Sequence, residues 1–176
     1  MKRAVFLDRD GVLNALEPRG GRLRAPVTLA AFRLLPGAAD AVRRLRDGGF
    51  VCLVATNQPE VAGGELDPVV LEAMHARLRQ ETGVDGIYVC PHVDADGCAC
   101  RKPQPGLLLR AATDWNIDVA ASFLIGDRWR DIEAGAAAGC TTVLLEGSSE
   151  PSGRPDVRAA TLADAVAIIM KAREAR

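Results

Sequence analysis

The sequence contains no long apolar run. None of its apolar stretches approaches the ~20 continuous residues that a helix needs to cross a bilayer. The N-terminal Met1-Lys2-Arg3 is followed by only four apolar residues before Asp8, which is too short for the apolar part of a secretory signal. We therefore expect a cytoplasmic protein with no membrane partner.

An excess of charge of one sign is absent, and aromatic side chains are scarce. The 22 lysines and arginines are balanced by 23 acidic residues, giving a net charge of -1, and aromatic residues make up 4% of the chain. This composition provides neither the basic channel nor the aromatic platform that a nucleic-acid phosphatase would need. Because 176 residues are enough for one core, we predict a single domain over residues 1–176, present as a monomer without a nucleic-acid partner.

A disulfide framework is not expected either. Five cysteines cannot all pair, and a chain without an export signal does not favour disulfides. Cys52 and Cys140 stand in apolar surroundings and are interpreted as buried core residues. The remaining three cysteines lie together between residues 90 and 100, which suggests a different use for them.

Short apolar runs rich in Val, Ile, Leu and Phe alternate with segments of helical period. Continuous apolar runs of this length are typical of strands that are covered on both faces. The predicted strands are Ala4 to Leu7, Phe50 to Ala55, Gly86 to Val89, Ser122 to Ile125 and Thr141 to Leu145. The predicted helices are Pro36 to Asp47, Pro68 to Thr82 after an Asp67 N-cap, Pro105 to Trp115, Asp131 to Ala138 and Thr161 to Ala175. This order predicts an α/β fold with a doubly wound, mostly parallel, Rossmann-like sheet and helices on both faces.

In such a sheet, ligands bind beyond the carboxyl ends of the strands. Asp8 and Asp10 follow the first predicted strand, and their spacing lets both carboxylates point to one side while Arg9 points away. Asp8 can attack a phosphorus atom, while Asp10 protonates the leaving oxygen and later takes a proton from the hydrolytic water. Two carboxylates and an anionic substrate require a hard divalent cation, and Mg²⁺ fits best.

Other strand ends supply further groups for phosphoryl transfer. Thr56 and Asn57 follow the second strand and offer uncharged donors for phosphoryl oxygens. Lys102 supplies a point positive charge, and Asp127, after the fourth strand, supplies another hard metal ligand. Asp131 can orient Lys102 or a metal-bound water. Each residue alone is more often structural, but their succession after separate strands favours catalysis.

Four short motifs resemble those of the haloacid dehalogenase-like phosphatases. They are Asp8-Arg9-Asp10-Gly11, Thr56-Asn57-Gln58, Arg101-Lys102-Pro103 and Gly126-Asp127-Arg128-x-x-Asp131. The resemblance extends from Val5 to about Leu145, which is nearly the whole chain. The spans 14–36 and 59–86 leave little room for an inserted cap domain, so loops must recognise the substrate.

The resemblance implies a role for each motif. Asp8 is the nucleophile and a metal ligand, and Asp10 is the acid and base, with its backbone carbonyl on Mg²⁺. Thr56 and Lys102 hold the phosphoryl group. Asp127 is a further ligand of the same metal ion.

The segment from Cys90 to Cys100 carries a four-ligand set for tetrahedral zinc. Its members are Cys90, His92, Cys98 and Cys100. Because the protein supplies all four ligands, no position stays open for water and the role of the ion should be structural. The alternative is two pairs of unrelated reduced residues.

This loop also resembles that of one branch of the family. A Cys-x-His pair and a Cys-x-Cys pair that run into Arg101-Lys102-Pro103 are similar to those of the heptose 1,7-bisphosphate phosphatases, which remove the phosphate at carbon 7. Histidinol-phosphate phosphatases are the nearest alternative, and the continuation Pro105-Gly106 favours the heptose branch. The resemblance implies a small phosphorylated sugar as substrate, bound by Asn57, Arg101 and Arg128, with Arg101 on its second phosphate.

The second motif departs from the family pattern. The family usually continues into a small residue, a glycine and later an arginine, whereas this chain reads Pro59-Glu60-Val61-Ala62-Gly63-Gly64. The segment Leu16 to Pro26 is predicted to be a flexible basic loop. Arg19, Arg22 or Arg24 of this loop can replace the positive charge of the arginine that is missing after the second motif. Alternatively, all three arginines are solvated.

Two other interpretations concern single features. The alternative to an enzyme is a catalytically silent zinc-loop protein that binds phosphorylated ligands or a protein partner. The presence of all four residues Asp8, Asp10, Lys102 and Asp127 argues against it. His75, within the predicted helix that ends at Thr82, is expected to be a surface or packing residue.

Overall fold

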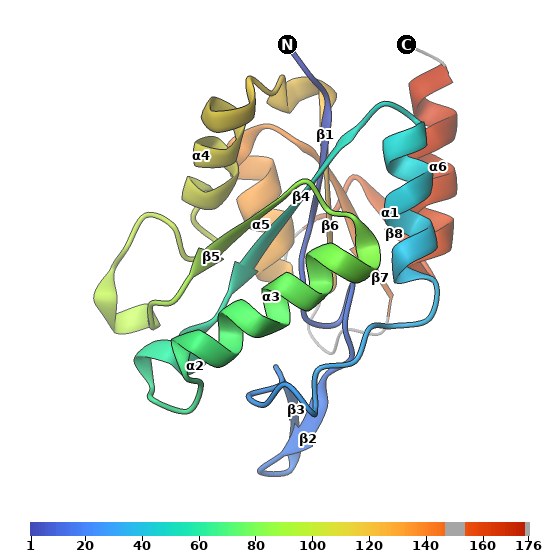
Figure 1. Ribbon diagram of the computed structural model, residues 1–176. Coiled ribbons are helices and arrows are strands. Elements are labelled where there is room, and N and C mark those ends of the chain that lie inside the picture. Colours follow the sequence, from blue (N-terminus) through green and yellow to red (C-terminus); the bar gives the residue numbers. More distant parts are fainter. Residues whose placement is uncertain (147–153, 175–176) are drawn as a thin grey trace.

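The computed structural model describes residues 1–146 and 154–174. Six parallel strands form one sheet in the order β5-β4-β1-β6-β7-β8 (Figure 1). The strands are β1 (Ala4–Leu7), β4 (Val51–Asn57), β5 (Gly86–Cys90), β6 (Phe123–Gly126), β7 (Thr141–Leu145) and β8 (Val157–Ala159). The prediction of a doubly wound parallel α/β sheet is confirmed.

The predicted helices are present in the predicted order, and the short helix α2 (Pro59–Ala62) is an addition that was not predicted. The predicted helices are α1 (Ala38–Asp47), α3 (Pro68–Thr82), α4 (Gly106–Trp115), α5 (Trp129–Ala138) and α6 (Leu162–Glu174). The Asp67 side chain caps α3 by accepting a hydrogen bond from the Val69 amide at 2.7 Å. Helix α5 begins two residues earlier than predicted, because the Asp131 carboxylate accepts the Arg128 amide and closes the first turn. Ala175, the predicted end of the last helix, lies outside the described residues.

Helices cover both faces of the sheet, which explains the continuous apolar runs. Successive side chains of a strand point to opposite faces. Val5 and Leu7 accordingly join a core formed with α1, α3 and α6, whereas Ala4 and Phe6 join a second core formed with α4 and α5. All four side chains are fully buried.

Two strand assignments from the sequence were incomplete. The segment predicted to be a flexible loop contains an antiparallel hairpin of β2 (Glu17–Arg19) and β3 (Arg22–Arg24). Gly20 and Gly21 form its two-residue turn with φ values of 59° and 72°, which suit a type I′ turn. The sixth strand, β8, was missed because it is only three residues long. Among the described residues, no helix is both long and apolar enough to cross a membrane.

Strand β1 lies between β4 and β6, where the order of the strands reverses. In open α/β sheets this switch point opens a crevice beyond the carboxyl ends of the strands. Helix α2 and the β2–β3 hairpin lie at that end of the sheet, and the N-terminus lies at the other (Figure 1). The carboxyl end is therefore where the candidate chemical groups gather.

Candidate active site

Four loops bring the predicted phosphoryl-transfer residues together at this edge. Asp8 follows β1, and its amide donates to the carbonyl of Ile125 in β6 at 3.0 Å. Thr56 lies at the end of β4, Lys102 lies in the loop after β5, and Asp127 directly follows β6. Asp8, Thr56 and Lys102 are at most 7% exposed. The structure thus places side chains that lie far apart in the chain in one buried group.

Lys102 occupies the centre of this group. Its Nζ atom donates to Asp8 Oδ1 at 2.9 Å, to Asp131 Oδ1 at 2.5 Å and to the Ala55 carbonyl at 2.7 Å. Burial alone would lower the pKa of Lys102, but the charges of Asp131 and Asp8 outweigh burial and raise the pKa above its ordinary value. The ammonium group therefore stays charged and fixes the Asp8 carboxylate.

Three carboxylates of the site form a candidate cation centre. Oxygens of Asp8, Asp127 and Asp131 lie within 4.8 Å of one another. Burial and the neighbouring carboxylates raise the pKa of Asp8 to about 6, although Lys102 opposes the shift. Burial, Asp8 and Asp131 raise the pKa of Asp127 to about 8, and Asp127 Oδ1 is buried without a hydrogen-bond partner among the described residues. An oxygen-only set with an unpartnered buried oxygen fits a hard divalent cation such as Mg²⁺.

Two glycines allow this close approach. A Cβ atom at Gly11, where φ is 91°, would overlap the Asp127 carboxylate, and one at Gly126 would overlap Asp131. The metal set predicted from the sequence contained Asp8, Asp10 and Asp127. The structure adds the Asp131 carboxylate to the same centre, while Asp10 was predicted to contribute only its backbone carbonyl, and its carboxylate is not part of the cluster.

Asp10 is held by donors that the sequence did not reveal. Its Oδ1 accepts hydrogen bonds from Arg9 and Asn14, and its Oδ2 accepts one from Gln58 Nε2 at 2.6 Å. Burial raises the pKa of Asp10, but the Arg9 charge and the bonds from Asn14, Arg9 and Gln58 outweigh it and hold the pKa below its ordinary value. Arg9 does not line the pocket, but its long side chain folds back onto the Asp10 carboxylate, a contact that the sequence analysis did not predict. Gln58 belongs to the recognised motif Thr56-Asn57-Gln58, and its place in that motif was the one sequence feature that could have marked it as a site residue.

Thr56 and Asn57 make different contacts. Thr56 is fully buried, and its Oγ1 accepts a hydrogen bond from Gln58 Nε2 at 2.8 Å. Asn57 was predicted to bind substrate, yet both ends of its amide bond the backbone of Lys102, at 3.0 and 3.1 Å. Although Asn57 lines the pocket, these bonds mean that it holds the Lys102 loop against β4.

A pocket of about 350 Å³ opens over these groups. Arg101 and Arg128, predicted to bind substrate, line it together with Asp8, Asp10 and Lys102. Arg130, which the sequence analysis did not single out, lines it as well, and so do Arg22 and Arg24 of the hairpin. Five arginines therefore line the pocket that contains the candidate nucleophile.

The rim of this pocket is tied down by ion pairs. Arg19 of the hairpin lies 3.9 Å from Glu60 of α2 and 3.5 Å from Glu65. On the other side, Asp94 accepts hydrogen bonds from Arg101 and Arg130, at 2.6 and 2.8 Å, and these bonds lower its pKa. Glu60, the acidic departure from the family pattern, thus holds the hairpin and lines the pocket.

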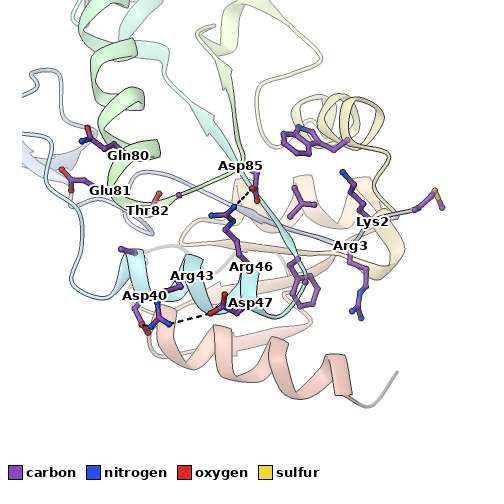
Figure 2. A pocket seen from close by; sticks show the side chains of 17 residues that line it. Lys2, Arg3, Asp40, Arg43, Arg46, Asp47, Gln80, Glu81, Thr82 and Asp85 are labelled. Carbon is purple, nitrogen blue, oxygen red and sulfur yellow. Dashed lines mark hydrogen bonds and ion pairs between the residues drawn. The ribbon is translucent and has the colours of Figure 1, made fainter.

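A larger hollow of about 1140 Å³ lies at the opposite, amino end of the sheet (Figure 2). Its charged side chains largely pair with one another, as Arg46 does with Asp85 and Arg43 with Asp40 and Asp47. The cluster of Asp8, Asp127 and Asp131, the candidate cation centre found among the described residues, lies at the other end of the sheet. We therefore assign the chemistry to the smaller pocket.

The predicted zinc ligands come together in the loop between β5 and α4. Cys90 Sγ lies 3.5 Å from His92 Nδ1 and 3.6 Å from Cys98 Sγ, and Cys100 Sγ lies 3.4 Å from both His92 Nδ1 and Cys98 Sγ. With Zn–S near ~2.3 Å and Zn–N near ~2.0 Å, a tetrahedral site separates its ligand atoms by roughly 3.5–3.8 Å. The donor types and their spacing fit zinc.

Comparisons with known proteins agree with this geometry. A family model described as HAD-hydrolase-like matches residues 99–169. The D-glycero-beta-D-manno-heptose-1,7-bisphosphate 7-phosphatase of Pseudomonas aeruginosa is 39% identical, over 81% of this chain and 80% of the relative. The enzyme of the same name from Bordetella bronchiseptica is also 39% identical, over 82% and 80%.

A solved structure is similar over almost the whole length. It is the D,D-heptose 1,7-bisphosphate phosphatase from B. bronchiseptica complexed with magnesium and phosphate. The two structures superpose with a TM-score of 0.81 at 32% identity, covering 97% of this chain and 99% of the other.

Proposed function

The chain belongs to the haloacid dehalogenase-like phosphatases, and we propose that it hydrolyses the 7-phosphate of D-glycero-D-manno-heptose 1,7-bisphosphate. The observation that carries this proposal is the position of Lys102 between Asp8 and Asp131, whose carboxylates cluster with Asp127, a residue with one buried oxygen that has no partner among the described residues. A lysine that fixes one carboxylate, next to a carboxylate cluster suited to Mg²⁺, is what an aspartyl nucleophile and a phosphate dianion require.

The chemistry follows from the roles of the side chains. Asp8, Asp127 and Asp131, with the backbone carbonyl of Asp10, would hold Mg²⁺, which neutralises the charge of the carboxylates and the phosphate. A carboxylate oxygen of Asp8 attacks phosphorus, and the bond from phosphorus to the sugar oxygen breaks. Thr56 and Lys102 hold the phosphoryl oxygens during the transfer. The product of this first half-reaction is a phosphoaspartate.

Asp10 moves the protons in both half-reactions. In the first, it gives its proton to the leaving sugar oxygen, and the nearby phosphate dianion favours this protonated form by raising the pKa of Asp10. In the second, the carboxylate of Asp10 takes a proton from water, which attacks the phosphoaspartate and releases phosphate. Asp8 returns to its starting state.

The arginines of the pocket favour a substrate with a second phosphate. Arg101 and Arg128 line the pocket beyond the nucleophile, together with Arg130 and the hairpin arginines. A guanidinium group binds phosphate through two parallel hydrogen bonds, so several of them suit a bisphosphate better than the cationic side chain of histidinol phosphate. The zinc ion on Cys90, His92, Cys98 and Cys100 is proposed to be structural and to hold the loop that carries Arg101 and Lys102.

Phosphate release in the presence of Mg²⁺ tests the function. Both anomers of heptose 1,7-bisphosphate, histidinol phosphate and simple hexose phosphates should be compared at equal concentrations. We expect the highest kcat/KM with a heptose bisphosphate. A preference for histidinol phosphate would reject the proposed substrate but leave the mechanism intact.

The Asp8→Asn variant tests the mechanism itself. An amide cannot form the phosphoenzyme, so we expect turnover to fall by about 10⁴-fold or more, because it removes the nucleophile. The loss should apply to every substrate. Wild-type turnover by this variant would show that the covalent route is wrong and would favour a binding protein with incidental activity.

A further inference from the structure

A buried hydrogen-bonded network lies behind Asp10 and extends to helix α3. Arg9 and His75 are its outermost members, and they are 0% and 2% exposed. Neither has a role in the mechanism described above. The guanidinium group of Arg9 also lies over the ring of Phe32, with 5.6 Å between Cζ and the ring centroid.

Arg9 connects three side chains. Its Nε and Nη2 atoms donate to Asp10 Oδ1 at 3.2 and 2.9 Å, and Nη2 also donates to Gln58 Oε1 at 3.0 Å. Its Nη1 atom lies 3.1 Å from His75 Nε2. Each of the three nitrogens of the guanidinium group therefore has a partner, which fixes the orientation of the group.

The chemistry of arginine fixes the state of the histidine. A guanidinium group has only donors, so His75 Nε2 must be the acceptor in this bond. The imidazole ring is then neutral and carries its proton on Nδ1. Burial and the Arg9 charge agree with this state, since they lower the pKa of His75 to about 4.

We propose that Arg9 and His75 are positioning residues for proton transfer by Asp10. His75 sets the orientation of the Arg9 guanidinium group, which in turn sets the plane of the Asp10 carboxylate. Asn14 and Gln58 complete the set, and Gln58 links Asp10 to Thr56 through a single Nε2 atom. Helix α3, which lies outside the pocket, thereby fixes the geometry of the acid and base. This inference rests on the proposed role of Asp10.

The competing explanation is structural only, namely that a buried arginine simply needs acceptors. The two explanations differ in their dependence on the leaving group. Nitrophenolate leaves without a proton, whereas a sugar alkoxide needs one from Asp10. Misplacing Asp10 should therefore slow the cleavage of a sugar phosphate and spare that of p-nitrophenyl phosphate. A general loss of structure would slow both reactions alike.

The experiment compares kcat/KM for heptose 1,7-bisphosphate and p-nitrophenyl phosphate, because this constant reports the steps up to the phosphoaspartate. In His75→Leu, which has no acceptor, we expect a loss of about tenfold with the sugar phosphate and less than twofold with the aryl phosphate. His75→Gln keeps an acceptor oxygen and should restore both values to within about twofold of wild type. If the enzyme prefers histidinol phosphate, that alkyl ester replaces the sugar without changing the comparison.

Two further variants complete the test. Leu78→Val alters the apolar packing of the same helix and should leave the ratio of the two constants unchanged. Arg9→Lys keeps the charge but removes the planar guanidinium group. It should show the loss expected for His75→Leu, selective for the sugar phosphate, and it provides this test even if His75→Leu does not fold. Circular dichroism verifies folding in each case. Equal losses with both substrates, or none with the sugar phosphate, in a folded variant would overturn the proposal.

Asp10→Asn separates this proposal from the proposed function. If Asp10 is the acid, its variant should lose about 10²-fold or more in kcat/KM with the sugar phosphate and far less with the aryl phosphate. Should Asp10→Asn itself treat the two substrates alike, the assignment of the acid would fail, and the positioning role would fail with it. A selective loss in Asp10→Asn without one in His75→Leu and Arg9→Lys would reject the positioning role alone.

Discussion

At the scale of single residues, the site depends on buried charges that compensate one another. Lys102 is 2% exposed and stays charged because Asp8 and Asp131 surround it. Removing one partner of such a set leaves a buried charge unpaired, which costs a protein several kcal/mol. The same residues therefore serve stability and chemistry. Asp127 is the exception, since its free oxygen has no protein partner in the described part of the chain.

His75 should make the free energy of unfolding depend measurably on pH. Its pKa is lowered from 6.5 to about 4 in the folded protein, so between these values the unfolded chain binds a proton that the folded chain does not. The contribution of the neutral His75 to the free energy of unfolding is fully present above pH 6.5 and is lost as the pH falls toward 4. At 1.36 kcal/mol per pKa unit, the loss amounts to about 3 kcal/mol at most.

Denaturant unfolding of wild type and His75→Gln at pH 7.5 and pH 4.5 measures this contribution. The acidic residues with lowered pKa values also weaken the protein in acid, but they do so in both proteins and cancel in the comparison. We expect the wild type to lose about 2 kcal/mol more than the variant between the two pH values. Equal losses would mean that His75 titrates normally in the folded state.

At the scale of elements, the loop between β5 and α4 connects the cysteine cluster to Lys102. Cys100 is followed directly by Arg101 and Lys102, and Arg101 Nη1 donates to the His92 carbonyl at 3.1 Å. Order in the cluster is thus passed to Arg101 and Lys102, the two residues proposed to bind the substrate. A structural zinc ion would supply that order, because its four protein ligands would tie both ends of the loop to one ion.

The Cys98→Ser variant tests the zinc assignment. We expect wild-type protein to bind one zinc ion per chain, and the variant to lose it along with about tenfold in KM, since the loop would no longer hold Arg101 in place. Metal content can be measured by atomic emission after purification without added zinc. Cys140→Ser, at a buried cysteine outside the cluster, is the matched control and should keep its zinc. Retention of zinc by Cys98→Ser would rule out this ligand set.

The elements differ in how well the sequence predicts them, and burial explains why. Strands β1 and β7 were placed at their observed ends because both faces are covered and the runs are apolar. In the β2–β3 hairpin, β3 is exposed and β2 is only partly buried through the charged Glu17 and Arg19, so the hairpin leaves no apolar pattern, and only the Gly20-Gly21 turn marks it. The contact of Arg9 with His75 joins residues 66 positions apart, and no local pattern encodes it.

At the scale of the whole molecule, the direction of the chain through the sheet assembles the site. Because all six strands are parallel, the loops after β1, β4, β5 and β6 emerge at one edge. This rule allowed Asp8, Thr56, Lys102 and Asp127 to be grouped from sequence order alone. It could not supply Asp131 as a member of the acidic cluster or Arg130 in the pocket, since these depend on how α5 packs against β6.

The two ends of the sheet should therefore respond differently to the loss of an arginine. Arg46 lines the large hollow at the amino end, is about half exposed and pairs with Asp85 at 3.3 Å (Figure 2). Exposed ion pairs contribute about 1 kcal/mol or less, so Arg46→Ala should cost little stability and leave kcat and KM within about twofold of wild type. Arg101→Ala, at the carboxyl end, should raise KM about tenfold or more, because it removes a guanidinium group that is proposed to bind phosphate. Steady-state kinetics with heptose 1,7-bisphosphate compares the two variants directly. If Arg46→Ala raised KM as much as Arg101→Ala, the larger hollow would take part in substrate binding, and the assignment of the site to the carboxyl end alone would have to be abandoned.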